Sequence, residues 1–233
     1  MMLLRNLFFL LILTISQNSA ALETITLAAE NSWPPYSDEA GNGISKKIIQ
    51  AAYNAVNIHV KFIVVPYARA LKMAKNGQVD GAFNVTKQKS TVDLFNFGEI
   101  PILQANASFY YHNDTLINFT SADDISKKTS VGVIIGYEYG DNYEKNRNRF
   151  KEVRVANQIQ LIKLLKKKRI DVAIMFNDVV KSKLSDMGLQ PNDIRKGKLH
   201  QKSDIYVAFS KSKNTRNAIK MLDKGLKKTH NQK

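Results

Sequence analysis

The stretch HVKFIVVPYARALKMAKNGQVDGAFNV, residues 59–85, decides the fold because its hydrophobic pattern changes twice. HVKFIVV (59–65) is rich in β-branched residues and predicts a strand, whereas ARALKMAKNG (68–77) predicts a helix that ends at a glycine. VDGAFNV (79–85) is a short apolar segment and predicts a second strand. This order is typical of a βαβ unit in a largely parallel sheet.

The same alternation extends in both directions from this unit. We expect further strands at 25–29, 107–113, 129–135, 153–156, 169–176 and 204–212, and helices at 45–56, 157–168 and 215–228. Two segments echo each other, VDGAFN (79–84) and IDVAIMF (170–176), since each follows a helix and begins with an aliphatic residue and Asp. The sequence therefore predicts an α/β fold that repeats in two lobes.

The expected lobes share one chain that crosses between them twice. The first lobe comprises residues 22–104 and 204–233, and the second lobe comprises residues 105–203. The chain would leave the first lobe near Gln104 and return near Ser203. Two crossing strands would then form a hinge with a cleft beside it.

The N-terminal segment MMLLRNLFFLLILTISQNSAALE has the pattern of a secretory signal. Arg5 is followed by an apolar run at 7–15 and by small residues at 19–21. The apolar run is shorter than the roughly 20 residues that a membrane-spanning helix needs, which disfavours the alternative of an uncleaved anchor. We expect residues 1–21 to be removed and the protein to be periplasmic.

Composition excludes several kinds of site. The chain has no cysteine, so disulfides and thiolate metal sites are impossible, and its four histidines lack ligand spacing. We therefore expect no metal and no cofactor.

The net charge of +15 is compatible with nucleic acid or an anionic surface as a partner. Export disfavours nucleic acid. The densest basic run, KLLKKKR (163–169), closes an amphipathic helix, where a solvated face is the ordinary interpretation and attraction to anionic lipid is the alternative.

The loop WPPY (33–36) follows the first expected strand, at the edge where open α/β sheets bind ligands. Its prolines fix the backbone and would present Trp33 and Tyr36 as a stiff aromatic wall. The alternative is that Trp33 only covers a hydrophobic edge.

Two later loops follow strands at the same edge. In VPYARA (65–70), Tyr67 follows a proline and Arg69 opens a helix. NVTKQKS (84–90) offers hydrogen-bonding side chains and one positive charge from Asn84, Thr86 and Lys89. We expect these loops to converge on one cleft.

The chain resembles the periplasmic solute-binding proteins of ABC importers, of the family 3 or polar amino-acid type. The resemblance extends from residue 24 to about 225, through ENSWPPYSDEAGNG (30–43), VPYARALKMAKNGQVDGAFNVTKQK (65–89), FNFGEIPI (95–102), VGVIIGYEYG (131–140) and KKRIDVAI (167–174). It implies the type II periplasmic-binding-protein fold, two α/β lobes that close on a ligand.

The resemblance also implies roles for individual residues in the first lobe. Glu30 and Trp33 match an acidic and an aromatic residue that flank the first loop, and Tyr67 matches an aromatic residue that stacks on the ligand. Asn84 and Thr86 match small polar contacts. Lys89 stands where amino-acid binders keep an arginine for the ligand carboxylate, and a lysine cannot make the same two-pronged contact.

The second lobe departs from the family pattern as well. Gly136, Tyr137 and Glu138 replace the usual Gly-Ser or Gly-Thr turn, and Phe176 stands where an acidic residue is expected, which only a register shift would return to Asp178. A standard α-amino acid is therefore not the expected ligand. The expected ligand-binding residues are Glu30, Trp33, Tyr36, Tyr67, Arg69, Asn84, Thr86, Lys89, Tyr137, Glu138 and Asp178.

The expected function is capture of a small polar or zwitterionic, amino-acid-like solute by a monomeric, non-catalytic protein that delivers it to an inner-membrane ABC permease. Two alternatives stay open at this point. One is a stand-alone periplasmic sensor without a transport role. The other is an enzyme on the same fold, similar to cyclohexadienyl dehydratase, with Glu30 or Glu138 as acid or base.

Overall fold

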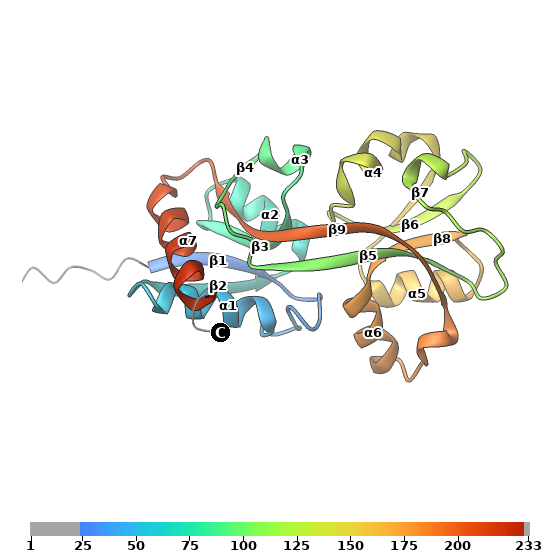
Figure 1. The fold of residues 1–233 in the computed structure, drawn as a ribbon, viewed down its shortest axis with the longest axis horizontal. Coiled ribbons are helices and arrows are strands. Elements are labelled where there is room, and N and C mark those ends of the chain that lie inside the picture. The colour runs from blue at the N-terminus through green and yellow to red at the C-terminus, as the bar shows by residue number, and fades with distance from the viewer. Residues whose placement is uncertain (1–23, 231–233) are drawn as a thin grey trace, which may run out of the picture.

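The computed structural model describes residues 24–230. The expected signal segment, residues 1–21, lies outside them. Figure 1 shows two groups of helices and strands connected by two long strands that run through both. The α/β, two-lobed architecture expected from the sequence is therefore confirmed.

The first lobe is built on three parallel strands in the order β2-β1-β3. Its strands are β1 (Thr24–Glu30), β2 (His59–Val65), β3 (Gly81–Thr86) and the short β4 (Phe95–Phe97). Its helices are α1 (Ile44–Asn54), α2 (Tyr67–Lys75), α3 (Lys89–Val92) and α7 (Arg216–His230). The βαβ unit read from residues 59–85 is thus present with nearly the predicted limits.

The second lobe repeats this plan. Its strands β6 (Ser130–Ile134), β7 (Lys151–Val155) and β8 (Val172–Phe176) are parallel, with β6 between the other two. Its helices are α4 (Gly140–Asn146), α5 (Gln158–Lys166) and α6 (Asn177–Asp186), and short 3-10 helices lie at Ala122–Asp124, Arg147–Arg149 and Pro191–Asp193.

Two antiparallel strands, β5 (Leu103–Tyr111) and β9 (Arg195–Ser210), connect the lobes (Figure 1). They join both lobes into one sheet of order β2-β1-β3-β9-β5-β8-β6-β7, with β4 paired to β9. Gln104 pairs with Asp204 in this ladder. The crossing pair predicted near Gln104 and Ser203 is present, whereas the lobe limits themselves stay a prediction.

The internal echo has a physical cause. Asp80 accepts a hydrogen bond of 2.7 Å from the backbone N–H of Thr26, and Asp171 accepts one of 2.7 Å from the backbone N–H of Ser130. In each lobe an aspartate before one strand therefore satisfies an N–H near the start of the neighbouring parallel strand. The repeated aliphatic-Asp pattern reflects the same local structure in both halves.

The sequence-based assignment missed α3, α4, α6 and β4, and it placed the starts of β5 and β9 too late. β9 begins at Arg195, nine residues before the predicted strand, within the polar segment RKGKLHQKS. Such a segment lacks the apolar alternation that marks a strand, because most of its side chains are exposed or half-buried. It is a strand because β5 supplies its hydrogen-bonding partners.

Helices α1 and α7 pack against each other through a glycine. A Cβ atom on Gly225 would collide with the backbone carbonyl of Ala52, which cannot move as a flexible side chain can. The Tyr53 hydroxyl donates a hydrogen bond of 3.1 Å to the Ala218 carbonyl at the same contact.

We predict that Gly225→Ala lowers the free energy of unfolding by about 1–3 kcal/mol, the usual cost of overpacking. Alanine is a better helix former than glycine by about 1 kcal/mol, so helix propensity alone would raise the free energy of unfolding. Urea denaturation decides between the two. Lys224→Ala, an exposed position on the same helix, is the control and should change little.

Candidate functional site

A small hollow lies between the lobes, beyond the carboxyl ends of the central strands. Its volume is about 10 Å³, room for about one water molecule. The first lobe contributes residues from β1, the loop after it, α2 and β3, and the second lobe contributes residues from the loop after β6 and from β8. The lining residues are Glu30, Trp33, Tyr67, Asn84, Thr86, Tyr137, Glu138 and Phe176.

Trp33 is held rigidly in its loop. Its backbone N–H donates to the Ser37 carbonyl at 2.8 Å, and its own carbonyl accepts from the N–H of Tyr36 at 2.9 Å. Its ring is only 1% exposed, packs on Tyr36 at 4.4 Å between centroids, and meets Phe176 of the other lobe edge-on at 5.1 Å. Trp33 thus belongs to the core and also lines the hollow, while its contact with a ligand stays a prediction.

Asn84 occupies a special position in β3. Its φ of 68° lies in the left-handed region, which Asn tolerates better than most residues, and the register of β3 against β9 shifts between Phe83 and Val85. At this irregularity the Asn84 side chain is buried, with 5% exposed, and lines the hollow. Strained backbone of this kind is concentrated at functional sites.

Two lining side chains carry unsatisfied polar atoms. Neither Nε1 of Trp33 nor either amide atom of Asn84 has a hydrogen-bond partner among the described residues. Leaving buried polar atoms unpaired costs about 1–3 kcal/mol each. The hollow therefore offers hydrogen bonds to a polar molecule.

Two tyrosine–glutamate hydrogen bonds close the hollow. The Tyr67 hydroxyl of the first lobe donates to Glu138 of the second at 2.6 Å, and the Tyr137 hydroxyl of the second lobe donates to Glu30 of the first. The two rings meet edge-on, 5.0 Å between centroids. The contacts are reciprocal, so each lobe gives one hydroxyl and one carboxyl group to the closed form.

Burial changes the acidity of both carboxyl groups. It raises the pKa of Glu30 from 4.5 to about 8, although the bond from Tyr137 lowers that pKa and the nearby Glu138 raises it. Burial likewise raises the pKa of Glu138 to about 8, against bonds from Tyr67 and from the backbone of Thr86. Both groups are therefore protonated to a large extent at neutral pH.

Four of the expected ligand-binding residues lie outside this hollow. Tyr36 is buried behind Trp33, and its hydroxyl donates to the exposed Asp178 at 2.6 Å, which makes a third contact between the lobes. Arg69 and Lys89 are exposed and line no cleft hollow, and the backbone N–H of Lys89 donates to Asp141 at 3.0 Å. Direct ligand contact by all eleven expected residues stays a prediction.

Phe176, which stands where the sequence resemblance implies an acidic residue, lines the hollow. Two glutamines that the sequence did not single out also shape the site, and one of them, Gln88, accepts a hydrogen bond of 2.9 Å from the Gly140 N–H across the lobes. Gln158 lines a second, adjoining hollow of about 160 Å³, which shares Glu30, Tyr67 and Tyr137 with the first. No motif marks a lone glutamine as a cleft residue, so only the three-dimensional arrangement identifies it.

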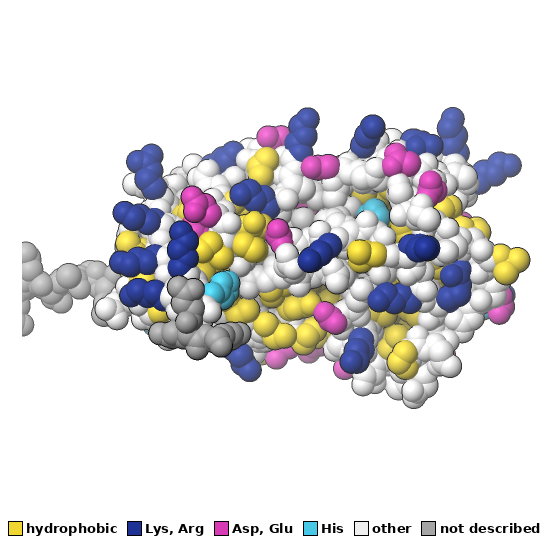
Figure 2. Space-filling model, in the orientation of Figure 1, with side chains coloured by type: hydrophobic (Ala, Val, Ile, Leu, Met, Phe, Trp, Pro, Cys, Tyr) yellow, Lys and Arg dark blue, Asp and Glu magenta, His cyan; other side chains and the backbone are white. Residues whose placement is uncertain are grey.

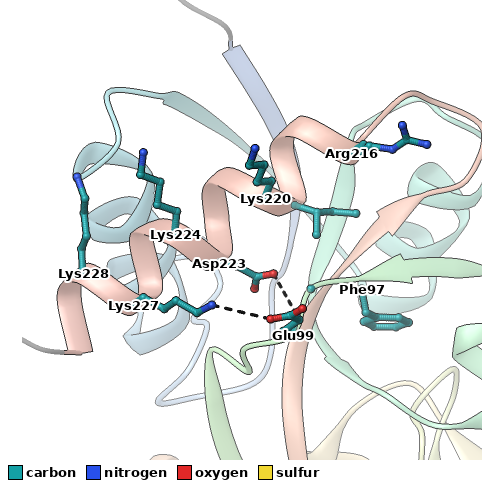
Figure 3. A pocket seen from close by; sticks show the side chains of 10 residues that line it. Phe97, Glu99, Arg216, Lys220, Asp223, Lys224, Lys227 and Lys228 are labelled. Carbon is teal, nitrogen blue, oxygen red and sulfur yellow. Dashed lines mark hydrogen bonds and ion pairs between the residues drawn. The ribbon is translucent and has the colours of Figure 1, made fainter.

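A larger hollow lies elsewhere in the structure. It measures about 690 Å³ and runs along α7 in the first lobe, beside Phe97 and Glu99 (Figure 3). Lys227 pairs with Glu99 at 3.9 Å, while Asp223 accepts the backbone N–H groups of Glu99 and Ile100. Figure 2 shows basic side chains grouped over this end of the molecule. This open groove is lined by one lobe only, so it is not a cleft that closure could seal.

None of the helices within residues 24–230 combines the length and apolar character that a membrane span requires. No group of three or more His, Asp or Glu side chains among these residues could hold a metal ion.

Comparison with solved structures identifies similar folds at low sequence identity. An ancestral arginine-binding protein bound to arginine has a TM-score of 0.73 at 17% identity, over 89% of this chain and 92% of that chain. An amino acid ABC transporter substrate-binding protein from Streptococcus pneumoniae bound to L-arginine has a TM-score of 0.71 at 18% identity, over 90% of each chain.

A third similar structure is an ancestral amino acid-binding protein described as a precursor of cyclohexadienyl dehydratase. Its TM-score is 0.69 at 14% identity, over 89% of this chain and 90% of that chain. No protein-family model matches the chain, and no curated protein matches it in sequence. The fold is thus that of two-lobed amino-acid-binding proteins, as the sequence resemblance implied.

We predict that the buried carboxyl groups make stability fall as pH rises from about 4.5 to 8. In this window the folded protein binds more protons at Glu30 and Glu138 than the unfolded chain does, so the free energy of unfolding decreases. Glu138→Gln removes one of these groups and should make the decrease shallower. Urea denaturation at several pH values measures the slope.

The control for this experiment is Glu39→Gln, which alters an exposed carboxyl group in the loop after β1. Its slope should equal that of the wild type. An unchanged slope in Glu138→Gln would contradict the raised pKa of Glu138.

Proposed function

We propose that this protein is a solute-binding protein that encloses a small polar molecule between its two lobes. The observation that carries the proposal is the interlobe hollow with its unpaired polar atoms, Trp33 Nε1 and the Asn84 amide. Buried polar atoms are ordinarily paired because an unpaired one is costly, and these atoms belong to residues that line the hollow between the lobes. A bound solute supplies their partners.

The mechanism of capture follows from the interlobe contacts. A ligand shifts an equilibrium between open and closed forms only by its difference in affinity for the two. A solute that touches Trp33 and Asn84 on one lobe and Glu138 and Phe176 on the other binds the closed form better. Closure then shields the solute from water, and reopening releases it.

Delivery to an inner-membrane ABC permease from the periplasm is the transport role we propose. Its support is the fold shared with an ABC transporter substrate-binding protein and the secretory pattern of residues 1–21. Co-purification of the exported protein with a permease tests this role. If it binds a solute but no permease, a stand-alone sensor is the better description.

An acid–base enzyme on the same scaffold is the second candidate function. Two carboxyl groups with raised pKa in one cleft are what a general acid needs near neutral pH, and one similar structure is a dehydratase precursor. No nucleophile beside a base lines the described cleft, so binding is preferred. Turnover of small cyclic acids by the purified protein would reverse this preference.

We predict that a thermal-shift screen of amino acids, amines, small organic acids and neutral polar solutes identifies a ligand. A solute at 100 times its dissociation constant adds about 2.7 kcal/mol of stability. For a protein of this size that corresponds to a rise in Tm of about 5–10 °C. Failure of every class to raise Tm would contradict the proposed function.

We predict that Trp33→Phe weakens binding of that ligand about 5-fold or more, because it removes the Nε1–H donor and keeps an aromatic ring. Titration calorimetry measures the affinity. Phe83→Leu is the matched control, since Phe83 is a buried core residue of the same lobe and lines neither cleft hollow. It should lower stability and leave the affinity unchanged. If Trp33→Phe lowers stability and leaves the affinity unchanged, Trp33 belongs to the core alone.

A further inference from the structure

We infer that the solute of this cleft is an organic cation that carries an ammonium or guanidinium group and no carboxylate, held by Glu30 and Glu138 within a set of aromatic rings. The inference rests on the proposed function, because it names the chemical class of solute for the same site.

The charges that line the cleft favour a cation. Glu30 and Glu138 are the ionisable acids of the two hollows, and among the described residues that line them there is no Lys, Arg or His. Arg69 and Lys89, the expected partners of a ligand carboxylate, are both exposed outside the hollows. A carboxylate would therefore lose its hydration beside two acids without gaining a positive partner.

The hydrogen bonds within the cleft favour a ligand that donates hydrogen bonds. In the closed form the hydroxyl groups of Tyr67 and Tyr137 donate to Glu138 and Glu30. When a carboxyl group is ionised it only accepts, so a ligand group that replaces these hydroxyls at its oxygens must be a donor. Ammonium has three N–H donors and guanidinium has five, and their bonds to a carboxylate are about twice as strong as neutral ones.

The aromatic residues supply the remaining surface. Tyr67 meets Tyr137 at 81° and Trp33 meets Phe176 at 90°, so ring faces and edges point in several directions around the hollow. The faces of such rings attract cations, more strongly when water is excluded. The unpaired Trp33 N–H and Asn84 amide are neutral and fit a hydroxyl or carbonyl oxygen of the same solute.

The space for such a solute spans both cleft hollows. Glu30, Tyr67 and Tyr137 line the small hollow of about 10 Å³ and also the adjoining one of about 160 Å³. The Tyr137–Glu30 hydrogen bond therefore lies at the boundary between them. In the proposed complex the cationic end of a short chain takes the place of the Tyr137 hydroxyl at Glu30, a residue that lines both hollows.

Matched compounds test the inference by calorimetry on the mature protein. Agmatine, arginine and 4-guanidinobutanoate form one series, and cadaverine, lysine and 6-aminohexanoate form the other. In at least one series the compound without a carboxylate should bind 10-fold or more tightly than both relatives. Equal or tighter binding of the carboxylate-bearing compounds overturns the inference, as does failure of both agmatine and cadaverine to bind.

These outcomes separate the inference from the proposed function. If a carboxylate-bearing or neutral solute binds and Trp33→Phe lowers the affinity for that solute, the cleft is a solute-binding site. In that case only the inference that the solute is a cation is wrong. If no solute of any class binds, the proposed function fails as well.

Two variants locate the cation. Glu138→Gln keeps an acceptor for Tyr67 but removes the charge, and it should weaken binding of the preferred cation 10-fold or more. Glu30→Gln tests the second carboxyl group and serves if the first variant fails to fold, as judged by circular dichroism. Glu39→Gln leaves the affinity unchanged because that side chain is exposed outside the cleft. Full affinity in both cleft variants would overturn the inference.

Proton release gives an independent measurement. Glu30 interacts electrostatically with Tyr137, Tyr67 and Glu138, and Glu138 interacts with Glu30, Tyr67, Tyr139 and Glu144. Burial raises the pKa of both carboxyl groups to about 8, so a cation that binds their ionised form releases protons at pH 7, and its affinity rises from pH 6 to 8. Calorimetry in buffers of different ionisation enthalpy detects this release. Proton uptake, or affinity that is constant with pH, would contradict the assignment.

Discussion

The antiparallel pairing of β5 with β9 is the constraint on which the rest of the structure depends. The ladder extends from Leu103 opposite Ile205 to Tyr111 opposite Arg195. The parallel strands of the first lobe join it through β3, and those of the second lobe join it through β8. The two sets enter one sheet from opposite ends, so their carboxyl ends face each other. The cleft is the space between them.

This arrangement brings together groups that are unstable when buried apart. Glu30 would be a buried carboxyl group without a donor if Tyr137 of the other lobe did not reach it, and Glu138 accepts hydrogen bonds from Tyr67 and from the backbone of Thr86, both in the first lobe. Burying an unpaired polar group costs more than a hydrogen bond returns. Closure is therefore stabilised by contacts that a suitable solute can replace, and this makes the closed form responsive to what occupies the cleft.

The sequence predicted much of the fold but only part of the site. The βαβ units could be predicted because apolar periodicity changes between strand and helix. The repeated motif at Asp80 and Asp171 could be recognised because the same local hydrogen bond occurs in both lobes. The polar first half of β9 could not be predicted from the sequence, because it is a strand only through pairing with β5, which lies far away in the chain. Likewise, the loops beside Trp33, Tyr67 and Asn84 indicated a cleft, but the exposure of Lys89 did not follow from its position in the motif.

By itself the sequence determined an α/β chain that crosses twice between two lobes, because strand and helix patterns are local properties of neighbouring residues. It also determined which loops follow the strands and carry aromatic and polar side chains. Only the tertiary structure decided that Tyr67 meets Glu138, that Tyr137 meets Glu30, and that no basic side chain among the described residues lines the cleft. The physical reason is that the direction of a side chain across a gap, and its burial there, depend on how the two lobes pack against each other.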